Sequence, residues 1–466
     1  MELGWLLQGM ADLIGPLRGW LGRMPGPMLL LAAGAAAALV IATTLVVLRR
    51  RRQAAQVRTE AVRNAAELLK DQLRQRLSEP PALFAPSTPA PTMGACEAFE
   101  GDIEAAARTV LLEAGGHRAK ARQLLRRRMK EDSGSLNGSE VAYWRQLGVL
   151  SLLDGSDDAL AAYARAADLA PENAEAQMLA GILHLRAGNL DAAEAAFRRQ
   201  IALGKAGNGA GGVARYRGHT MLGDVLAARE EHEQASAAYG EAQREVKALL
   251  EAEPTAAGLL RDLSVTCDRL GDVHLAKGEL DAALACYRQS LEIAEQQAKR
   301  EPERSVWQHD LSVSHDRIGD VLDRKGDRDG ALEHLRKGLA IAKALVARDP
   351  DNVQWQWDLS ASHDRIGDVL IAGGRMKEAL ASYRESLAIA EALAKRDPGN
   401  AGWQRDLAVS YHKVGSLEAI ANPSEARELL EKGRAIIDRL ARIAAHQAQW
   451  RSDLSRFDAV LKTLDN

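Results

Sequence analysis

The sequence contains few of the residues on which a sheet or a disulfide framework depends, and its net charge is small. Aromatic residues make up 4% of the 466 residues, while Ala, Leu, Arg and Glu dominate, which favours helices and argues against a strand-rich fold. The three cysteines, Cys96, Cys267 and Cys286, are odd in number and unclustered, so we expect a reducing compartment without disulfides. A formal net charge of −3 provides no overall field for nucleic acid, and no nucleic-acid partner is expected.

Signatures of catalysis are also missing from the sequence. It has no GxxxxGK[ST] phosphate loop, no HExxH motif, no GxSxG elbow and no CxxC pair. Ser264, Ser312 and Ser360 recur at one position of a repeat, which is typical of an architectural residue rather than a nucleophile. His315 and His363 also recur, but packed helices are about 8 to 10 Å apart, too far for ligands of one zinc ion. We therefore predict no enzyme activity, no cofactor and no metal site.

One long apolar run predicts a membrane anchor. The segment MLLLAAGAAAALVIATTLVVL, from Met28 to Leu48, carries no charge and is long enough to span a hydrocarbon core of roughly 30 Å. Arg49, Arg50, Arg51 and Arg52 follow it directly, and the positive-inside rule places this cluster in the cytosol. We expect a single-pass protein of the inner (plasma) membrane, with its N-terminus outside and the rest cytoplasmic. A cleaved signal peptide and a reversed orientation are the alternatives.

The segments around the anchor have distinct compositions. Residues 1–26 form either an amphipathic helix at the outer interface or a poorly ordered leader, ahead of the transmembrane helix at 27–48. Residues 49–78 are predicted as a juxtamembrane helix, and residues 79–95 as a proline-rich spacer. Residues 96–138 are predicted as a helical hairpin with a basic second helix. This hairpin either caps the following array or contacts lipid headgroups or nucleic acid.

A motif of about 16 residues is repeated along the second half of the chain. It is written WQHDLSVSHDRIGDVL at Trp307, WQWDLSASHDRIGDVL at Trp355 and WQRDLAVSYHKVGSLE at Trp403, with a spacing of 48 residues. A fixed period in this range marks a solenoid, in which each unit buries its apolar face against its neighbours. Such an array is built as a surface for partners.

The residues of these units resemble the tetratricopeptide repeat (TPR), a helix–turn–helix of 34 residues with small residues where its two helices cross. Residues 139–203 resemble two ordinary units, in which Gly148 and Gly181 occupy the small position of the first helix. Residues 214–466 resemble longer units, similar to kinesin light chain and bacterial WQRDLS-type arrays, with 14 extra residues that predict about two more turns on each helix. Their final first helix, beginning at Trp450, has no second helix and is predicted as a cap.

The resemblance implies an all-α fold, a TPR-type α-solenoid wound as a right-handed superhelix, behind the N-terminal transmembrane helix. Residues 204–213, GKAGNGAGGV, lack a preceding strand and are predicted as a glycine-rich joint between the short and long units. Asn352 and Asn400 are predicted N-caps, whereas Gly278 and Gly326 are predicted to end helices in the left-handed conformation.

The resemblance also implies that the first helices line a groove, which directs attention to a set of charged residues near the repeated glycine. The candidate groove residues are Asp268, Arg269, Asp272, Asp316, Arg317, Asp320, Asp364, Arg365 and Asp368. Asp pairs four residues apart on a helix repel each other, so a nearby cation is required. Either each Arg reaches back to the carboxylates of the preceding unit, or surplus carboxylates receive a basic peptide.

These observations favour a membrane-anchored cytosolic scaffold that binds protein or peptide partners, with a basic peptide as the expected chemistry. The alternative is a ligand-sensing signalling or defence regulator that oligomerises at the membrane. The two hypotheses differ in a measurable way, because only the second requires a ligand-dependent change of oligomeric state.

Overall fold

The computed structural model describes residues 62–67, 69, 100–114, 117–131, 139–153, 158–206, 211–443 and 448–465, and all regular structure in these ranges is helical. Residues 62–67 and 69 are helical, within the predicted juxtamembrane helix. The helices that follow are α4 (Glu100–Arg108), the π-helix η1 (Thr109–Glu113), α5 (Arg118–Glu131), α6 (Ser139–Leu153), α7 (Asp158–Leu169), α8 (Ala174–Arg186), α9 (Leu190–Ala206), α10 (Gly211–Ala228), α11 (His232–Ala252), α12 (Ala257–Ala276), α13 (Leu280–Arg300), α14 (Ser305–Arg324), α15 (Arg328–Arg348), α16 (Val353–Ala372), α17 (Met376–Arg396), α18 (Ala401–Ala421), α19 (Pro423–Ile443) and α20 (Ala448–Leu464).

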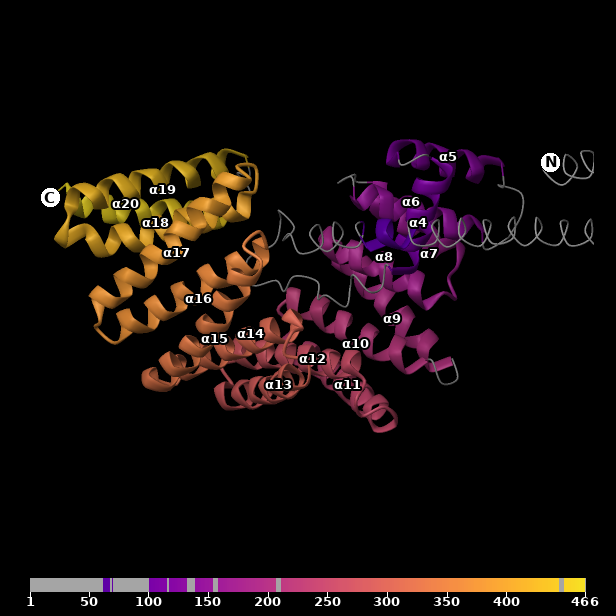
Figure 1. The fold of residues 1–466 in the computed structure, drawn as a ribbon, viewed down its shortest axis with the longest axis horizontal. Helices are drawn as coiled ribbons and strands as arrows, with labels where there is room; N and C mark the ends of the chain where they lie inside the picture. Colours follow the sequence, from indigo (N-terminus) through magenta and orange to yellow (C-terminus); the bar gives the residue numbers. More distant parts are fainter. Residues whose placement is uncertain are drawn as a thin grey trace, which may run out of the picture.

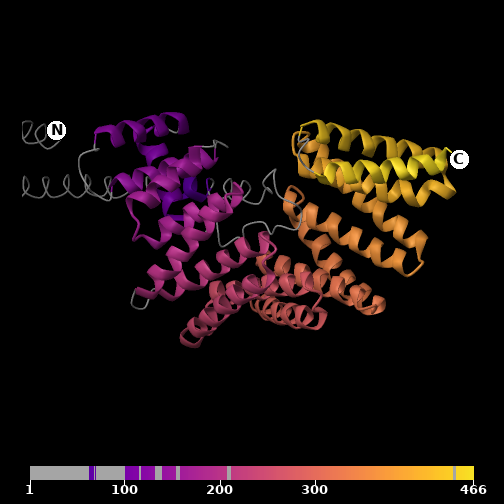
Figure 2. The same cartoon turned by 180° about the vertical axis from the view of Figure 1, so that it is seen from behind.

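These helices pack as successive antiparallel pairs that form an arc (Figure 1). The helices α5 and α6 lie near one tip of the arc, and α19 and α20 lie at the other, as the reverse view also shows (Figure 2). In the middle of the arc the first helices of the pairs, α10, α12 and α14, lie nearer its inside than the second helices α11, α13 and α15. In the middle of the arc the first helices therefore make up the inner face.

The short and long units differ in helix length. The helices α6 to α9 have 15, 12, 13 and 17 residues, whereas α12 to α17 have 20 or 21 each. The added residues extend both helices of a unit, so neighbouring long units share a larger buried surface. The last helix, α20, packs on α19 and α18 and ends the described array without a second helix of its own.

The repeated glycine of each first helix is required by close contact with a large side chain of the second helix. A Cβ atom on Gly271 would lie 2.5 Å from a ring carbon of Tyr287, and one on Gly319 would lie 2.6 Å from Cγ of Leu335. Such distances are shorter than real contacts, so a larger residue would separate the helices. The repeated alanine of the second helix, for example Ala331, is fully buried in the same crossing.

The helix ends follow the predicted signals. The Asn352 and Asn400 side chains accept hydrogen bonds from the backbone nitrogens of Trp355 and Trp403, both at 3.1 Å, which satisfies a donor at each helix start. Gly278 and Gly326 have φ of +77° and +85°, the left-handed conformation that glycine adopts without steric cost. These turns fix the two helices of each unit against each other.

The glycines of segment 204–213 pack closely where they are described. Residues 204–206 continue α9, and residues 211–213 begin α10, so the predicted joint is helical at both ends. A Cβ atom on Gly211 would lie 2.1 Å from the carbonyl oxygen of Gly204, so these glycines allow two backbones to meet. The glycines therefore serve contact between α9 and α10 rather than flexibility in the described part of the segment.

The predicted membrane anchor at Met28–Leu48, the leader at 1–26 and the spacer at 79–95 lie outside the described residues. Within the described ranges, no helix combines the length and the apolar character that crossing a bilayer requires.

Candidate functional site

Two of the three predicted groove arginines, Arg317 and Arg365, each lie between two carboxylates of the preceding unit. On α14, an Nη1 atom of Arg317 lies 3.5 Å from Asp268 and 3.4 Å from Asp272, both on α12. The same arrangement joins Arg365 on α16 to α14, with 3.4 Å to Asp316 and 3.1 Å to Asp320. The structure therefore contains the inter-unit pairing that the sequence analysis offers as one alternative.

The pairing continues toward the C-terminus with a different cation. Lys413 on α18 lies 3.5 Å from Asp364 and 2.9 Å from Asp368, both on α16. We call these six contacts the Gly-Asp ladder, because the outer carboxylate of each pair follows the repeated glycine, and we call each cation with its two carboxylates a rung. Each of its cations faces two carboxylates, so each rung carries excess negative charge when both carboxylates are ionised.

The two carboxylates of a rung differ in exposure. The inner side chains of Asp268 and Asp316 are 16% and 9% exposed, whereas the outer side chains of Asp320 and Asp368 are 37% and 54% exposed. Burial raises the pKa of Asp268 and of Asp316 to about 6, against the opposing attraction of Arg317 and Arg365. The inner carboxylates therefore serve packing between units, and the outer carboxylates are the ones that a partner can reach.

A tyrosine from the second helix holds the outer carboxylate in two of the rungs. The Tyr287 hydroxyl donates to Asp272 at 2.7 Å, and the guanidinium carbon of Arg317 lies 5.6 Å from the centre of the Tyr287 ring. Tyr383 and Lys413 repeat this pattern, with 5.0 Å between Nζ and the ring centre. These hydroxyl contacts are not among the contacts predicted from the sequence.

The first candidate arginine, Arg269, faces one carboxylate of the preceding α10–α11 pair. Arg269 on α12 is buried, and its Nε atom lies 3.5 Å from a carboxylate oxygen of Asp224 on α10. Asp224 also accepts a hydrogen bond from Tyr239 at 2.6 Å. Arg269 therefore supports the α10–α12 contact and is not presented on the surface.

A second ladder, absent from the sequence analysis, joins the first helices near their N-terminal ends. In each contact the acceptor is the Asp of the repeated WQxDLS motif. The donor is the residue that directly precedes the equivalent Asp of the previous unit. We call this second ladder the xDLS ladder. Its cationic contacts are Arg261 to Asp310 at 2.8 Å, His309 to Asp358 at 2.8 Å and Arg405 to Asp453 at 3.2 Å.

The histidine of this ladder is held in its charged form. His309 is buried enough to disfavour the imidazolium, but Asp358 and Asp310 outweigh burial and raise its pKa to about 10. The pKa of Asp310 is in turn lowered, because His309 and Arg261 both donate to its carboxylate and together outweigh the effect of burial.

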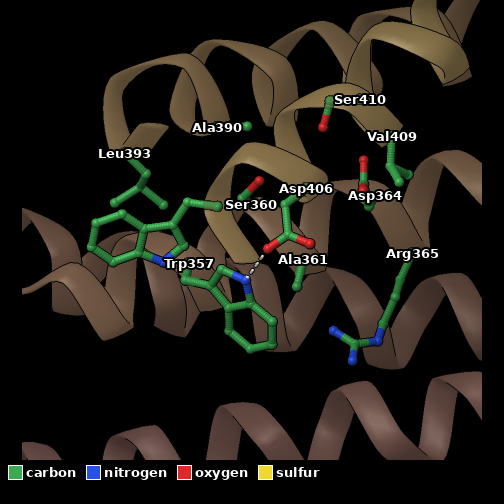
Figure 3. Close-up of a pocket in the computed structure, with 11 residues that line it drawn as sticks. Trp357, Ser360, Ala361, Asp364, Arg365, Ala390, Leu393, Asp406, Val409 and Ser410 are labelled. Atoms are coloured by element: carbon green, nitrogen blue, oxygen red, sulfur yellow. Dashed lines mark hydrogen bonds between the residues drawn. The ribbon is translucent and has the colours of Figure 1, made fainter. Parts of the chain in front are cut away.

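One position of the xDLS ladder has no cation. Between α16 and α18, the indole nitrogen of Trp357 donates to Asp406 at 2.9 Å in place of an Arg or His (Figure 3). Burial raises the pKa of Asp406, and the Trp357 hydrogen bond and the charge of Arg405 offset it only in part. Among the described residues, none forms a salt bridge with Asp406.

A pocket of about 240 Å³ opens at this irregular position. Trp357, which is 40% exposed, and Asp406 lie at one side of it, and Arg365 extends away at the other (Figure 3). The lining residues are Trp357, Ser360, Ala361, Asp364 and Arg365 on α16, Ala390 and Leu393 on α17, and Trp403, Asp406, Val409 and Ser410 on α18. Its walls thus combine indole rings with the carboxylates of both ladders.

Two stretches of the chain match profiles of the tetratricopeptide repeat family, residues 153–208 and residues 266–301. Together with the paired helices and the Gly–Tyr crossings, these matches define the class: the chain is a tetratricopeptide repeat protein. No protein of curated function matches the sequence.

Several solved structures resemble parts of the array. BtubC (BKLC) from P. vanneervenii shares 16% identity over 55% of this chain and 91% of its own, with a TM-score of 0.41. A putative kinesin light chain from Podosopora anserina with nearly identical TPR-like repeats shares 20% identity over 49% of this chain and 97% of its own, with a TM-score of 0.36. The apo form of RapI shares 14% identity over 61% and 94%, with a TM-score of 0.42. Identities at this level do not transfer a partner or an activity.

Proposed function

We propose that this protein is a membrane-anchored TPR scaffold that uses the inner face of its long units to hold protein partners in the cytoplasm. The single observation that carries the binding role is the row of outer carboxylates on successive first helices. Asp272, Asp320 and Asp368 are 41%, 37% and 54% exposed, and each shares its cation with a second, more buried carboxylate. A surface of this kind is complementary to an extended basic segment.

The rest of the rung explains why binding such a segment need not disturb the fold. The inner carboxylates and the cations are fixed by packing between units, and Tyr287 and Tyr383 hold two of the outer carboxylates in place. A partner that contacts the outer oxygens therefore meets a preorganised surface, which reduces the cost of ordering side chains on binding.

The membrane part of the proposal is supported by the sequence alone. The uncharged run from Met28 to Leu48 and the four arginines after it favour a single-pass anchor with the array on the cytoplasmic side. The proline-rich segment 79–95 would hold the array away from the bilayer.

The test is capture of partners from membranes by three forms of the full chain. The wild type is compared with a deletion of residues 257–466 and with the triple variant Asp272→Asn, Asp320→Asn, Asp368→Asn. We expect the deletion to abolish capture and the triple variant to weaken it, with unchanged helicity by circular dichroism because Asn can still accept the tyrosine hydrogen bonds.

Retention of the same partners by the deletion would refute a binding role for the long units. Retention by the triple variant alone would refute the role of the outer carboxylates and leave the scaffold intact. Measurement of oligomeric state with and without bound partner separates the scaffold from the ligand-sensing regulator, because a scaffold requires no change of state.

A further inference from the structure

The pocket between α16 and α18 has the walls of an arginine site without the arginine. Such a site with its arginine is present at the next interface along the chain, between α18 and α20. There, the Nε atom of Arg405 lies 3.2 Å from Asp453, and its guanidinium carbon lies 6.0 Å from the ring centre of Trp450. Guanidinium groups suit this combination, because they hydrogen-bond to carboxylates and stack on indole faces.

The pocket contains the equivalents of that aspartate and that tryptophan. Asp406 is the equivalent of Asp453, and Trp403 is the equivalent of Trp450, because each lies 47 residues earlier at the same position of the repeated motif. Both Asp406 and Trp403 line the pocket. The equivalent of Arg405 is Trp357, which supplies a neutral N–H to Asp406 instead of a charge. The Asp406 carboxylate is therefore present without the cation that its equivalent, Asp453, has at the α18–α20 interface.

At three other interfaces a cation contacts the equivalent aspartate. Arg261 approaches Asp310 through two nitrogens, with Nε at 2.8 Å and Nη2 at 3.2 Å from its two oxygens, and His309 approaches Asp358 at 2.8 Å. In the pocket, a second carboxylate, that of Asp364, also lines the wall, and its Oδ2 atom lies 3.5 Å from Nζ of Lys413.

The geometry points to this pocket as the receptor for an arginine side chain of an extended partner segment, which takes the place that Arg405 takes one unit later. The volume of about 240 Å³ suits a single side chain, since pockets for whole small-molecule ligands are typically about 300 Å³ or more. The inference rests on the proposed function and makes it more specific, because it names one anchor residue of the partner and its place on the array.

The test uses the full chain in detergent, labelled with 5-fluorotryptophan and observed by fluorine NMR. The probe is the peptide acetyl-Ala-Ala-Arg-Ala-Ala-amide, and its control is the same peptide with citrulline, which keeps the shape but not the charge. The Trp357 resonance is assigned with Trp357→Phe. We expect the arginine peptide to shift this resonance with an affinity about tenfold higher than the citrulline peptide.

Two variants probe the pocket chemistry. Asp406→Asn keeps an acceptor for Trp357 and removes the charge, so it should abolish the preference for arginine over citrulline. Trp357→Arg supplies the missing internal cation and should abolish peptide binding, which is then followed through the other fluorotryptophans. Ala372→Arg adds the same charge on the exposed end of α16 and should leave binding unchanged, because it lies 15 helical residues, about 22 Å, from Trp357, which is roughly two screening lengths.

Equal responses to the arginine and citrulline peptides would overturn the inference, as would an arginine preference that survives Asp406→Asn. Absence of any response in the wild type would also overturn it. The capture assay above distinguishes these results from failure of the scaffold itself: partners lost on deletion of residues 257–466 but held normally by Trp357→Arg would leave the scaffold standing without this anchor.

Discussion

Replacing Asp316 by Asn should stabilise the array at high pH and have much less effect at low pH. The Asp316 side chain is 9% exposed, faces Arg365, and lies near the carboxylates of Asp320 and Asp358. Burial raises its pKa from 3.8 to about 6, so ionisation costs the folded protein about 3 kcal/mol relative to the unfolded chain once the pH is well above both values.

The sign follows from proton binding by the two states. The folded protein binds this proton more tightly than the unfolded chain, so the stability associated with the protonated carboxyl is present at low pH and is lost as the pH rises through about 6. Asn mimics the protonated form and does not titrate. It also keeps an acceptor for the Ser362 hydroxyl, which donates to Asp316 at 2.7 Å.

The assay is amide hydrogen exchange of α14 and α16 in the full chain, measured by mass spectrometry, because repeat arrays can unfold in parts. Between pH 4.5 and pH 8, the free energy of opening of the Asn variant should gain about 2 kcal/mol relative to wild type. The control is Asp368→Asn, which is 54% exposed and should change stability by less than about 1 kcal/mol.

A difference between variant and wild type that does not vary with pH would refute the argument from burial. A variant that loses stability relative to wild type as the pH rises would show the opposite balance, in which attraction to Arg365 exceeds the cost of burying the carboxylate.

Three further predictions concern the crossings and the ladders. Gly367→Ala should lower the free energy of unfolding, measured in urea, by roughly 1 to 3 kcal/mol, because its Cβ would lie 2.3 Å from a ring carbon of Tyr383. Gly240→Ala, whose Cβ would have no atom within 4 Å, should raise it by about 1 kcal/mol, and equal effects of the two changes would disprove the steric reason. His309→Gln should destabilise the α14–α16 contact below about pH 6.5, with a difference that shrinks toward pH 10, where the folded histidine loses its proton; hydrogen exchange showing a constant difference would contradict this. Tyr287→Phe should cost about 1 kcal/mol through loss of its hydroxyl bond to the aspartate on α12, and a neutral result in the same exchange assay would show that this bond contributes nothing net.

The sequence predicts the architecture of the array because the constraints that build it are local and repeat in register. Glycine and alanine mark the helix crossings, and Asn400 and Gly278 mark helix ends through hydrogen bonds or conformations that few other residues provide. The lengthening of both helices follows from the period alone.

Contacts between units were predictable only where the same residue types recur. Arg317 and Arg365 repeat at one position, and their reach to the preceding carboxylates could be derived from charge. The xDLS ladder could not, because its donor is Arg, His or Trp in different units and lies 49 residues from its aspartate in the contacts of Arg261, His309 and Trp357. The pocket lies where Trp357 replaces the Arg or His of other units, so no repeated motif predicts it.

The cations of the Gly-Asp ladder come from the unit after the one that supplies the carboxylates, as in Arg365, which bonds residues 45 and 49 positions earlier. Every rung therefore runs in the same direction, and the units that contain α14 and α16 each present acceptors at one side and a donor at the other. Duplication or loss of one whole 48-residue unit would rejoin donor to acceptor across the new boundary. The array can thus be lengthened or shortened by whole units, which changes the number of contacts offered to a partner and requires no new type of interface between units.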